Sequence, residues 1–312
     1  MDALSSLLDG LRGDGAFLLR TSWQGPWSLR IMSEAPLTVL SAPKGEFCVV
    51  HDGREPTWVR PGDLVITRGP DHYLTADHPD TEPTIEIHEG EACYSLDGRP
   101  MEEEMSLGVR SWGNHLDGDT VMMVGAYLSI GEIGERLAKA LPPIIHLGPD
   151  DWDDTLVRVL DAEVMRDHPG QTTVLDRLLD LLVVSALRDW FERPEAEPPG
   201  WYRAQSDPIV GTAIRLMQNN PAEQWTVAQL ASEVGASRAV LARRFSELVG
   251  VPPMEFLTSW RIDLAADLLR SSDLTIAAVA DRVGYSTPFA LSAAFKRVRG
   301  MSPSEHRQLE AV

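Results

Sequence analysis

Basic side chains gather on two segments near the C-terminal end that resemble each other in length and apolar pattern. They are Arg238, Arg243 and Arg244 in the first segment, and Lys296, Arg297 and Arg299 in the second. Both residue types bind phosphate oxygens, and arginine also bonds bidentately with guanine. Two such segments suit nucleic acid if the fold exposes them together. The alternative to nucleic-acid binding is that each arginine lies on a helix surface that faces only solvent.

The two segments belong to copies of one unit. Gly235 and Gly284 are 49 residues apart, and the pairs Gly250/Gly300 and Pro253/Pro303 are each 50 apart. A repeat of this kind indicates that one supersecondary unit occurs twice. The elements that position the basic residues must therefore be built in the same way in both copies.

Each copy carries the signals of two short helices joined by a tight turn. Alanine lies four residues before each turn glycine, where a larger side chain would separate the helices. The turn glycine can close the first helix in the left-handed conformation. The expected N-caps are Thr226 and Ser237 in the first copy, and Thr275 and either Ser286 or Thr287 in the second. This is the helix-turn-helix plan, in which the second helix enters the major groove of DNA.

Residues 207–307 resemble the AraC/XylS-type transcription regulators, whose DNA-binding domain joins two helix-turn-helix units by one long helix. The matching stretches include "LASEVGASRAVLARRFSELVGVPP", "PMEFLTSWRIDLAADLLR" and "VADRVGYSTPFALSAAFKRVRGMSP". The resemblance implies base-reading positions at Arg238, Ala239, Ala242, Arg243, Phe289, Ser292 and Ala293. Phosphate contacts are expected at Ser237, Arg244, Thr287, Lys296, Arg297 and Arg299.

The chain departs from many family members at two of these positions. Ala239 and Ala293 stand where longer polar side chains are common, and alanine can only meet a thymine methyl group. We therefore expect Arg243 to be the principal base reader, with Arg238 as a helper. The second helix is expected to hold the DNA backbone more than it reads bases.

The N-terminal part, to about Leu147, consists of short runs rich in Val, Ile, Thr and Tyr between glycine and proline turns. Examples are "GEFCVVHDG", "RPGDLVITRGPDHYL" and "EACYSLDG". This pattern predicts an antiparallel sandwich or barrel. The runs resemble the cupin-like effector module of many AraC-type regulators. The expected fold class is α+β: a cupin-like antiparallel β-barrel with following helices, then an all-α domain with tandem helix-turn-helix units.

Two cysteines and a few rings are the candidate sensor groups. The cysteines are either buried strand residues or oxidant-sensing thiols, and a sensor needs an accessible thiolate of low pKa. A small organic effector in the barrel is equally compatible with inert cysteines. The candidates for an effector or redox site are Cys48, Cys93, Trp27, Trp58, His72 and Tyr94. Cys48 and His72 are weak metal candidates without a diagnostic spacing, so no metal or other cofactor is predicted.

Two further segments separate the ends of the chain. The first is "TTVLDRLLDLLVVSALRDWF", which as a helix would be apolar around most of its circumference. This predicts burial within its own domain, in a dimer interface, or in both. "ERPEAEPPG" indicates a linker. Another helical pattern is expected near Met123–Leu141. The expected domains are residues 1–147 for the sensor, 148–193 for a helical dimerisation or packing segment, 194–206 for a linker and 207–312 for DNA binding.

The net charge of −19 is unevenly distributed over the 312 residues. Residues 1–199 hold 16 Lys and Arg against 36 Asp and Glu, whereas residues 200–312 hold 12 against 11. The acidic excess therefore lies outside the basic repeats and does not argue against DNA, because attraction to phosphate depends on the local field.

These features together predict a transcription regulator that is not an enzyme. The chain opens without a signal-peptide pattern and contains no apolar run of about 18 residues, so a cytoplasmic protein without a membrane partner is expected. The expected partners are double-stranded DNA, a small effector or oxidant and a second copy of the chain, with RNA polymerase as a further candidate. The alternatives are a metal-dependent cupin enzyme with an accessory DNA-binding tail, and a regulator controlled by a protein partner.

Overall fold

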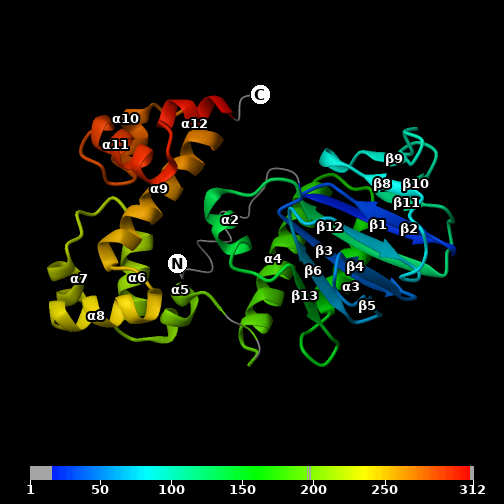
Figure 1. Ribbon diagram of the computed structural model, residues 1–312, viewed down its shortest axis with the longest axis horizontal. Helices are drawn as coiled ribbons and strands as arrows, with labels where there is room; N and C mark the ends of the chain where they lie inside the picture. Colours follow the sequence, from blue (N-terminus) through cyan, green and yellow to red (C-terminus); the bar gives the residue numbers. More distant parts are fainter. Residues whose placement is uncertain (1–15, 195, 197, 310–312) are drawn as a thin grey trace. The chain divides into compact units, whose positions relative to one another are not determined.

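The computed structural model describes residues 16–194, 196 and 198–309. They form two compact units (Figure 1). One unit contains the β-strands and two helices, and the other contains the C-terminal helices together with residues 131–140. Among the described residues, no helix has the length and apolar character that crossing a lipid bilayer would require.

The β-rich unit is built from two sheets that face each other. The seven-stranded sheet has the order β10 (Ser106–Gly108), β11 (Ser111–Gly113), β1 (Phe17–Trp23), β12 (Thr120–Tyr127), β3 (Leu37–Lys44), β6 (Leu64–Arg68) and β13 (Ile144–Leu147). The six-stranded sheet has the order β5 (Thr57–Val59), β4 (Phe47–His51), β7 (Tyr73–Ala76), β2 (Ser28–Ile31), β8 (Ile85–Ile87) and β9 (Cys93–Ser95).

This architecture agrees with the expected α+β class but differs in detail from an antiparallel barrel. Among the described strands the two sheets share no member, so hydrogen bonds do not close the barrel. Two strand pairs, β1 with β11 and β2 with β8, are parallel. The main core lies between the sheets and includes Trp23, Phe47 and Tyr73. Burial of such side chains is the main force that holds two sheets face to face.

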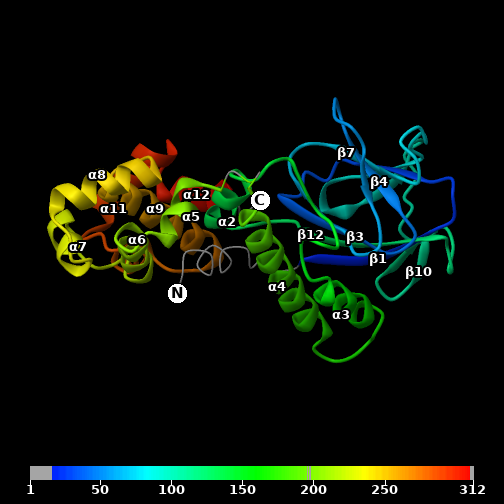
Figure 2. The ribbon, with the colours of Figure 1, turned by 90° about the horizontal axis from the view of Figure 1, so that it is seen from below.

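Helices α3 (Thr155–Val164) and α4 (Gln171–Phe191) lie side by side in this unit (Figure 2). Helix α4 packs on the seven-stranded sheet: a Cβ atom at Gly125 of β12 would lie 2.6 Å from Leu179 Cδ1. The hydroxyl of Tyr127 also donates to Asp180 Oδ1 at 3.1 Å. Packing thus buries one side of α4, whereas Val174 and Leu181 remain exposed.

The prediction of a helix near Met123–Leu141 is mostly wrong. Strand β12 occupies the chain as far as Tyr127, and helix α2 comprises only Glu132–Ala138. Most of β12 is buried, because α4 and the core between the sheets cover its two faces. Such a strand is a continuous apolar run without the alternation of a half-exposed strand. The expected linker, residues 194–206, likewise contains two short helical turns, α5 (Gly200–Arg203) and η2 (Ala204–Ser206).

The C-terminal helices form the two expected helix pairs around one long helix. The pairs are α7 (Val227–Glu233) with α8 (Arg238–Val249), and α10 (Ile276–Arg282) with α11 (Pro288–Arg299). Helix α9 (Pro253–Ser271) runs from one pair to the other (Figure 1). Helix α6 (Val210–Asn219) supports the first pair and α12 (Pro303–Leu309) supports the second.

Candidate functional site

The same local contacts position α8 and α11. The Ser237 hydroxyl accepts the Val240 N–H at 3.2 Å, and the Thr287 hydroxyl accepts the Ala290 N–H at 3.1 Å. Each hydroxyl satisfies one of the amide groups that a helix start leaves unpaired. Of the two N-caps considered for the second copy, the structure has Thr287.

The turns before these helices are also equivalent. The Ala236 N–H donates to Ala231 O and the Tyr285 N–H donates to Ala280 O, both at 2.8 Å, which is the six-residue closure of a Schellman motif. Gly284 has φ +83°, and a Cβ atom there would lie 2.7 Å from Pro221 O. The second turn therefore requires glycine for both its conformation and its close packing.

Buried side chains fix the inner faces of both helices. Leu241 and Phe245 of α8 and Leu291 and Phe295 of α11 are fully buried. These residues recur every four positions, so each helix buries one stripe and presents the opposite face to solvent. The exposed faces carry most of the residues that the sequence assigns to DNA.

Helix α8 exposes Arg238, Ala239 and Arg243, and leaves Ala242 half-buried. The Arg243 guanidinium contacts the Glu247 carboxylate one turn later, with Nη1 to Oε1 at 2.9 Å, and its side chain stays 66% exposed. An exposed pair of this type is worth under about 1 kcal/mol, so a guanine edge or a phosphate can displace Glu247. Arg243 therefore lies on the exposed face of α8 and is not buried.

Arg244 has a structural partner that its assignment to phosphate did not anticipate. Its guanidinium lies 2.6 Å from Asp207 Oδ2. The other carboxylate oxygen of Asp207 accepts the Ile209 and Val210 N–H groups at the start of α6. Arg244 thus ties α8 to the N-terminal end of α6, although its side chain remains partly exposed.

Helix α11 exposes Phe289, Ala293, Lys296 and Arg297, with Ser292 half-buried. Phe289 is 86% exposed in the first turn of the helix. An exposed aromatic ring at that position offers an apolar surface to a thymine methyl group. Lys296 and Arg297 lie near the other end of the helix, and both side chains are exposed.

The contacts of Arg299 differ from the phosphate contact that the sequence led us to expect. Its guanidinium forms ion pairs with Glu132 of α2 and with Asp263 of α9, the latter at 2.8 Å. All three side chains are largely buried, and burial raises the pKa of Asp263 while Arg136 and Arg299 oppose that rise. The Arg299 side chain therefore belongs to the packing of α2, α9 and α11.

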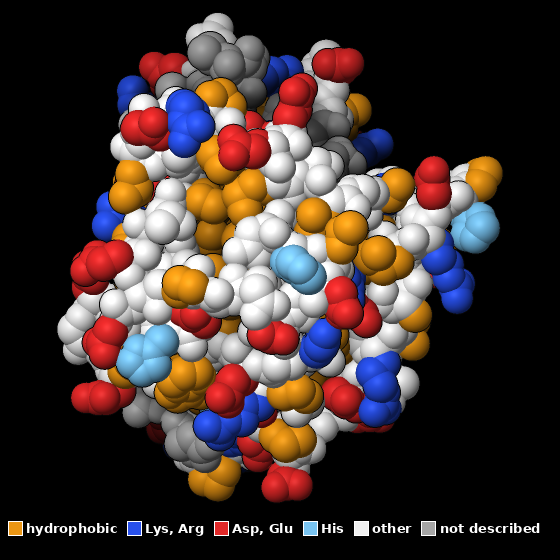
Figure 3. Space-filling view, turned by 90° about the vertical axis from the view of Figure 1, so that its right-hand side faces the viewer, with side chains coloured by type: hydrophobic (Ala, Val, Ile, Leu, Met, Phe, Trp, Pro, Cys, Tyr) orange, Lys and Arg blue, Asp and Glu red, His pale blue; other side chains and the backbone are white. Residues whose placement is uncertain are grey.

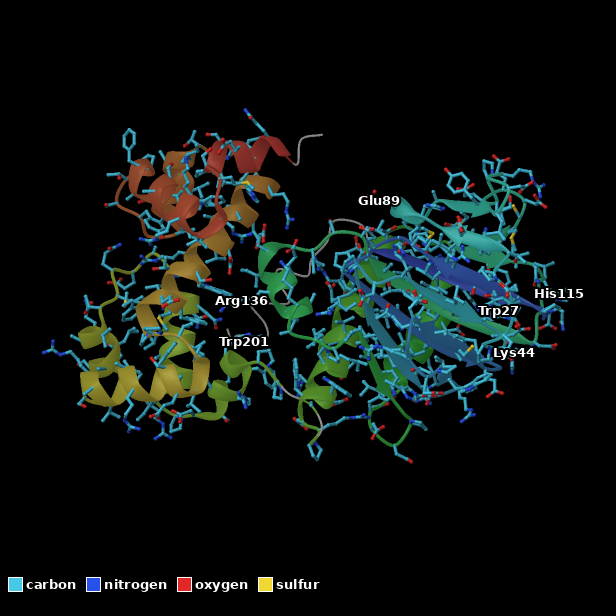
Figure 4. The ribbon with its side chains drawn as sticks, in the orientation of Figure 1. Trp27, Lys44, Glu89, His115, Arg136 and Trp201 are labelled. Atoms are coloured by element: carbon cyan, nitrogen blue, oxygen red, sulfur yellow. The ribbon has the colours of Figure 1, made fainter. Side chains whose placement is uncertain are left out.

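Helix α2 makes further contacts in this network. The Glu132 N–H donates to Asp267 Oδ1 at 2.7 Å, and Arg136 lies 3.4 Å from Asp263 Oδ2. Figure 4 shows Arg136 on α2, and its guanidinium lies 5.4 Å from the Phe256 ring centroid. Sequence reasoning missed Glu132, Arg136 and Asp263, because the contacts join residues more than 120 positions apart.

The two cysteines are buried strand residues. The Cys48 thiol donates to Ala76 O at 3.4 Å and the Cys93 thiol donates to Glu91 O at 3.3 Å. Burial raises the pKa of Cys48 to about 11 and that of Cys93 to about 12, with Glu102 and Glu91 adding to the rise at Cys93. Thiols of this kind are poor nucleophiles, because the thiolate is the reactive form.

We expect both thiols to react with iodoacetamide more than about 100-fold more slowly than free cysteine at pH 8, in proportion to their thiolate fractions. Mass spectrometry of the alkylated peptides measures each rate. The protein unfolded in urea is the control and should react at the free rate. Fast alkylation of the folded protein would instead favour a redox-sensing role.

The other sensor candidates are spread over the unit. Trp27, labelled in Figure 4, belongs to the core between the sheets. Its ring stacks on that of Trp23, with centroids 5.1 Å apart. Trp58 and Tyr94 are half-buried and His72 is exposed. Cys48 pairs with Ala76, four residues along the strand direction from His72, so about 13 Å separates the two weak metal candidates. Among the described residues, no three His, Cys, Asp or Glu side chains are grouped as metal ligands.

One cavity between the sheets brings together residues that the sequence did not single out. Its lining includes Thr75, Glu91, Trp112 and, of the predicted sensor residues, Cys93. On the face of the molecule in Figure 3, acidic, basic and apolar side chains are interspersed.

Comparisons with known proteins agree with both halves of this description. Residues 2–192 match the family model described as cupin, and residues 230–309 match that of a helix-turn-helix domain. An AraC-like transcription regulator of Streptomyces lividans is 32% identical over 99% of this chain and 98% of its own length. The HTH-type transcriptional regulator AlkR of Acinetobacter baylyi is 28% identical over 99% of both chains. A solved DNA-binding domain, that of AdpA in complex with a target DNA, is 35% identical over 33% of this chain and 93% of its own, with a TM-score of 0.32.

Proposed function

We propose that this chain, which belongs to the AraC family of transcription regulators, recognises one DNA sequence through α8 and α11. The observation that carries the proposal is the pair of exposed, side-chain-capped helices joined by a single long helix. The 19 residues of α9 span about 28 Å, which is close to one turn of B-DNA. The two helices are therefore suited to successive segments of the major groove.

The side chains divide into two groups by reach and chemistry. Arg243 and Arg238 of α8 have the length and donors to read guanine, and Phe289 of α11 offers contact with a thymine methyl group. Ser237, Thr287, Lys296 and Arg297 supply phosphate contacts. Selection of bound fragments from random or genomic DNA by the purified chain tests the proposal. It would be contradicted if no sequence were enriched over bulk DNA.

Replacing Lys296 with alanine is expected to weaken binding to all DNA sequences alike. The salt dependence of log K should flatten by about one unit, because one fewer counterion is released. Fluorescence anisotropy between about 50 and 200 mM salt measures this slope. Lys44→Ala, in the cupin unit, is the matched control and should keep the original slope. An unchanged slope for Lys296→Ala would remove Lys296 from the interface.

We further propose that the cupin unit responds to a small effector and that α2 carries the response. Helix α2 follows β12 and precedes β13 in the chain, yet its Glu132 and Arg136 pair with α9 and α11. A change in the two sheets would therefore act on the C-terminal end of α11 through only a few connecting residues. The raised pKa values of Cys48 and Cys93 favour a small-molecule signal over thiol oxidation.

The exposed Val174 and Leu181 on α4 support a homodimer as the acting form. A dimer would bring four helix-turn-helix units to two half-sites in the cytoplasm, with RNA polymerase as a further candidate partner. Sedimentation of the full chain as a monomer at micromolar concentration, both with and without DNA, would contradict the dimer.

A further inference from the structure

The cavity between the two sheets is small, and most of its lining residues are apolar. Its volume is about 50 Å3. Side chains such as Leu19, Leu29, Ile31, Leu40 and Val124 form its wall. This volume corresponds to about four water molecules, so it accommodates an organic molecule of only a few heavy atoms.

Three polar atoms on residues of this lining have no hydrogen-bond partner within the described part of the chain. They are Thr75 Oγ1 of β7, Trp112 Nε1 of β11 and Glu91 Oε1 of η1 (Glu89–Glu91). Thr75 is 1% exposed and Trp112 is 6% exposed, so bulk water does not satisfy them. Each unpaired buried group lowers the folding equilibrium by a factor on the order of ten. Three of them on the lining of one cavity are available to a bound molecule that brings its own donor and acceptor.

Glu91 is held in the cavity by an unusual backbone. Gly90 and Glu91 have φ of +71° and +61°, a conformation that L-residues rarely adopt. Ser33 forms a side-chain hydrogen bond with the Glu91 carboxyl group, and burial raises the pKa of that group. Strained backbone and a buried carboxyl group are costly, and they persist where the surrounding structure fixes them, most often at binding sites.

We propose that this cavity binds a small uncharged aliphatic alcohol. The hydroxyl hydrogen is donated to Glu91 Oε1, the hydroxyl oxygen accepts from Trp112 Nε1, and the hydrocarbon part lies against the aliphatic wall. The inference rests on the proposed function, in which occupancy of the cupin unit changes DNA binding. A hydrocarbon leaves both polar atoms unpaired, a carboxylate meets the Glu91 carboxyl group unfavourably, and an ammonium group offers no acceptor to Trp112.

Four probes of similar size test this selectivity on the full chain: butan-1-ol, pentane, butanoate and butylamine. Labelling the tryptophans with 15N reports the Trp112 indole N–H directly, and Trp112→Phe assigns its signal. We expect butan-1-ol to shift that signal with a dissociation constant of roughly 0.1–1 mM, and the other three probes to bind at least tenfold more weakly. Tighter binding of butanoate or butylamine, or no shift with butan-1-ol, would overturn the proposal.

Two neighbouring glutamates provide the matched variants. Glu91→Leu removes the acceptor, and the preference for butan-1-ol over pentane should fall at least tenfold. Glu89→Leu makes the same change two residues away, at an exposed position outside the lining, and should keep the preference (Figure 4). If Glu91→Leu does not fold, the Trp112→Phe variant serves in its place, with binding measured as the rise in Tm on adding each probe. It must show the same loss of preference for butan-1-ol over pentane.

DNA binding separates this inference from the proposed function. The affinity for a selected DNA site is measured with and without saturating butan-1-ol. A shifted Trp112 signal with unchanged DNA affinity supports the ligand class and contradicts effector control. Selection of no DNA sequence contradicts the proposed function while the probe series still decides the ligand class.

Discussion

Arg243→Ala is expected to weaken binding to the selected DNA site by about 1–3 kcal/mol and to relax the sequence preference at one base pair. Arg243 is exposed on α8 and long enough to bond bidentately with a guanine edge, whereas its neighbours Ala239 and Ala242 are not. Loss of a base contact affects the matching sequence alone, in contrast to loss of a phosphate contact. Anisotropy against a panel of single-base-pair variants of the site measures the difference.

Glu247 provides the control for this experiment. Its carboxylate holds Arg243 in the free protein, 2.9 Å from Nη1. Glu247→Gln weakens that ion pair and should leave the preference intact, with equal or slightly tighter binding. Should Arg243→Ala keep the full preference, Arg238 would become the principal reader.

The DNA-binding half was largely predictable because its determinants are local. N-cap hydroxyls, the turn glycines and the four-residue apolar spacing act within one or two helical turns, and the repeat presents each signal twice. The caps at Ser237 and Thr275 and the buried Phe245 and Phe295 follow directly from such signals. What could not be read locally is which cations are engaged elsewhere: Asp207 holds Arg244 from 37 residues away.

For the sensor half, only the fold class was predictable from the sequence. Alternation along a strand indicates which residues point inward, but not which inward residues fill space and which border a gap. Trp27 was a candidate for the effector site and stacks on Trp23, while Glu91, which was not among the candidates, lines the cavity. Glu91 has a left-handed backbone conformation and lines the cavity, and no simple sequence signal marks it.

Arg299→Met is expected to destabilise the C-terminal unit by about 3 kcal/mol, because it leaves the Glu132 and Asp263 carboxylates largely buried without their shared cation. Urea unfolding followed by helical circular dichroism measures the free energy of unfolding. Arg297→Met is the matched control: it removes an exposed cation two residues away on the same helix and should change stability by less than about 0.5 kcal/mol. Equal, small effects of the two substitutions would show that the ion pairs contribute little.

The variant Glu132→Gln separates stability from signalling, since it weakens the link between α2 and α11 but retains the ion pair between Arg299 and Asp263. Its affinity for DNA should stay within about threefold of the original, because no DNA-facing residue changes. If α2 carries the response of the cupin unit, however, the effect of effector on that affinity should fall severalfold, since a ligand shifts an equilibrium only through differential contacts. Hydrogen exchange at the α2 amides, measured on the same samples, should rise in Glu132→Gln without effector. An unchanged response together with raised exchange would exclude α2 as the route.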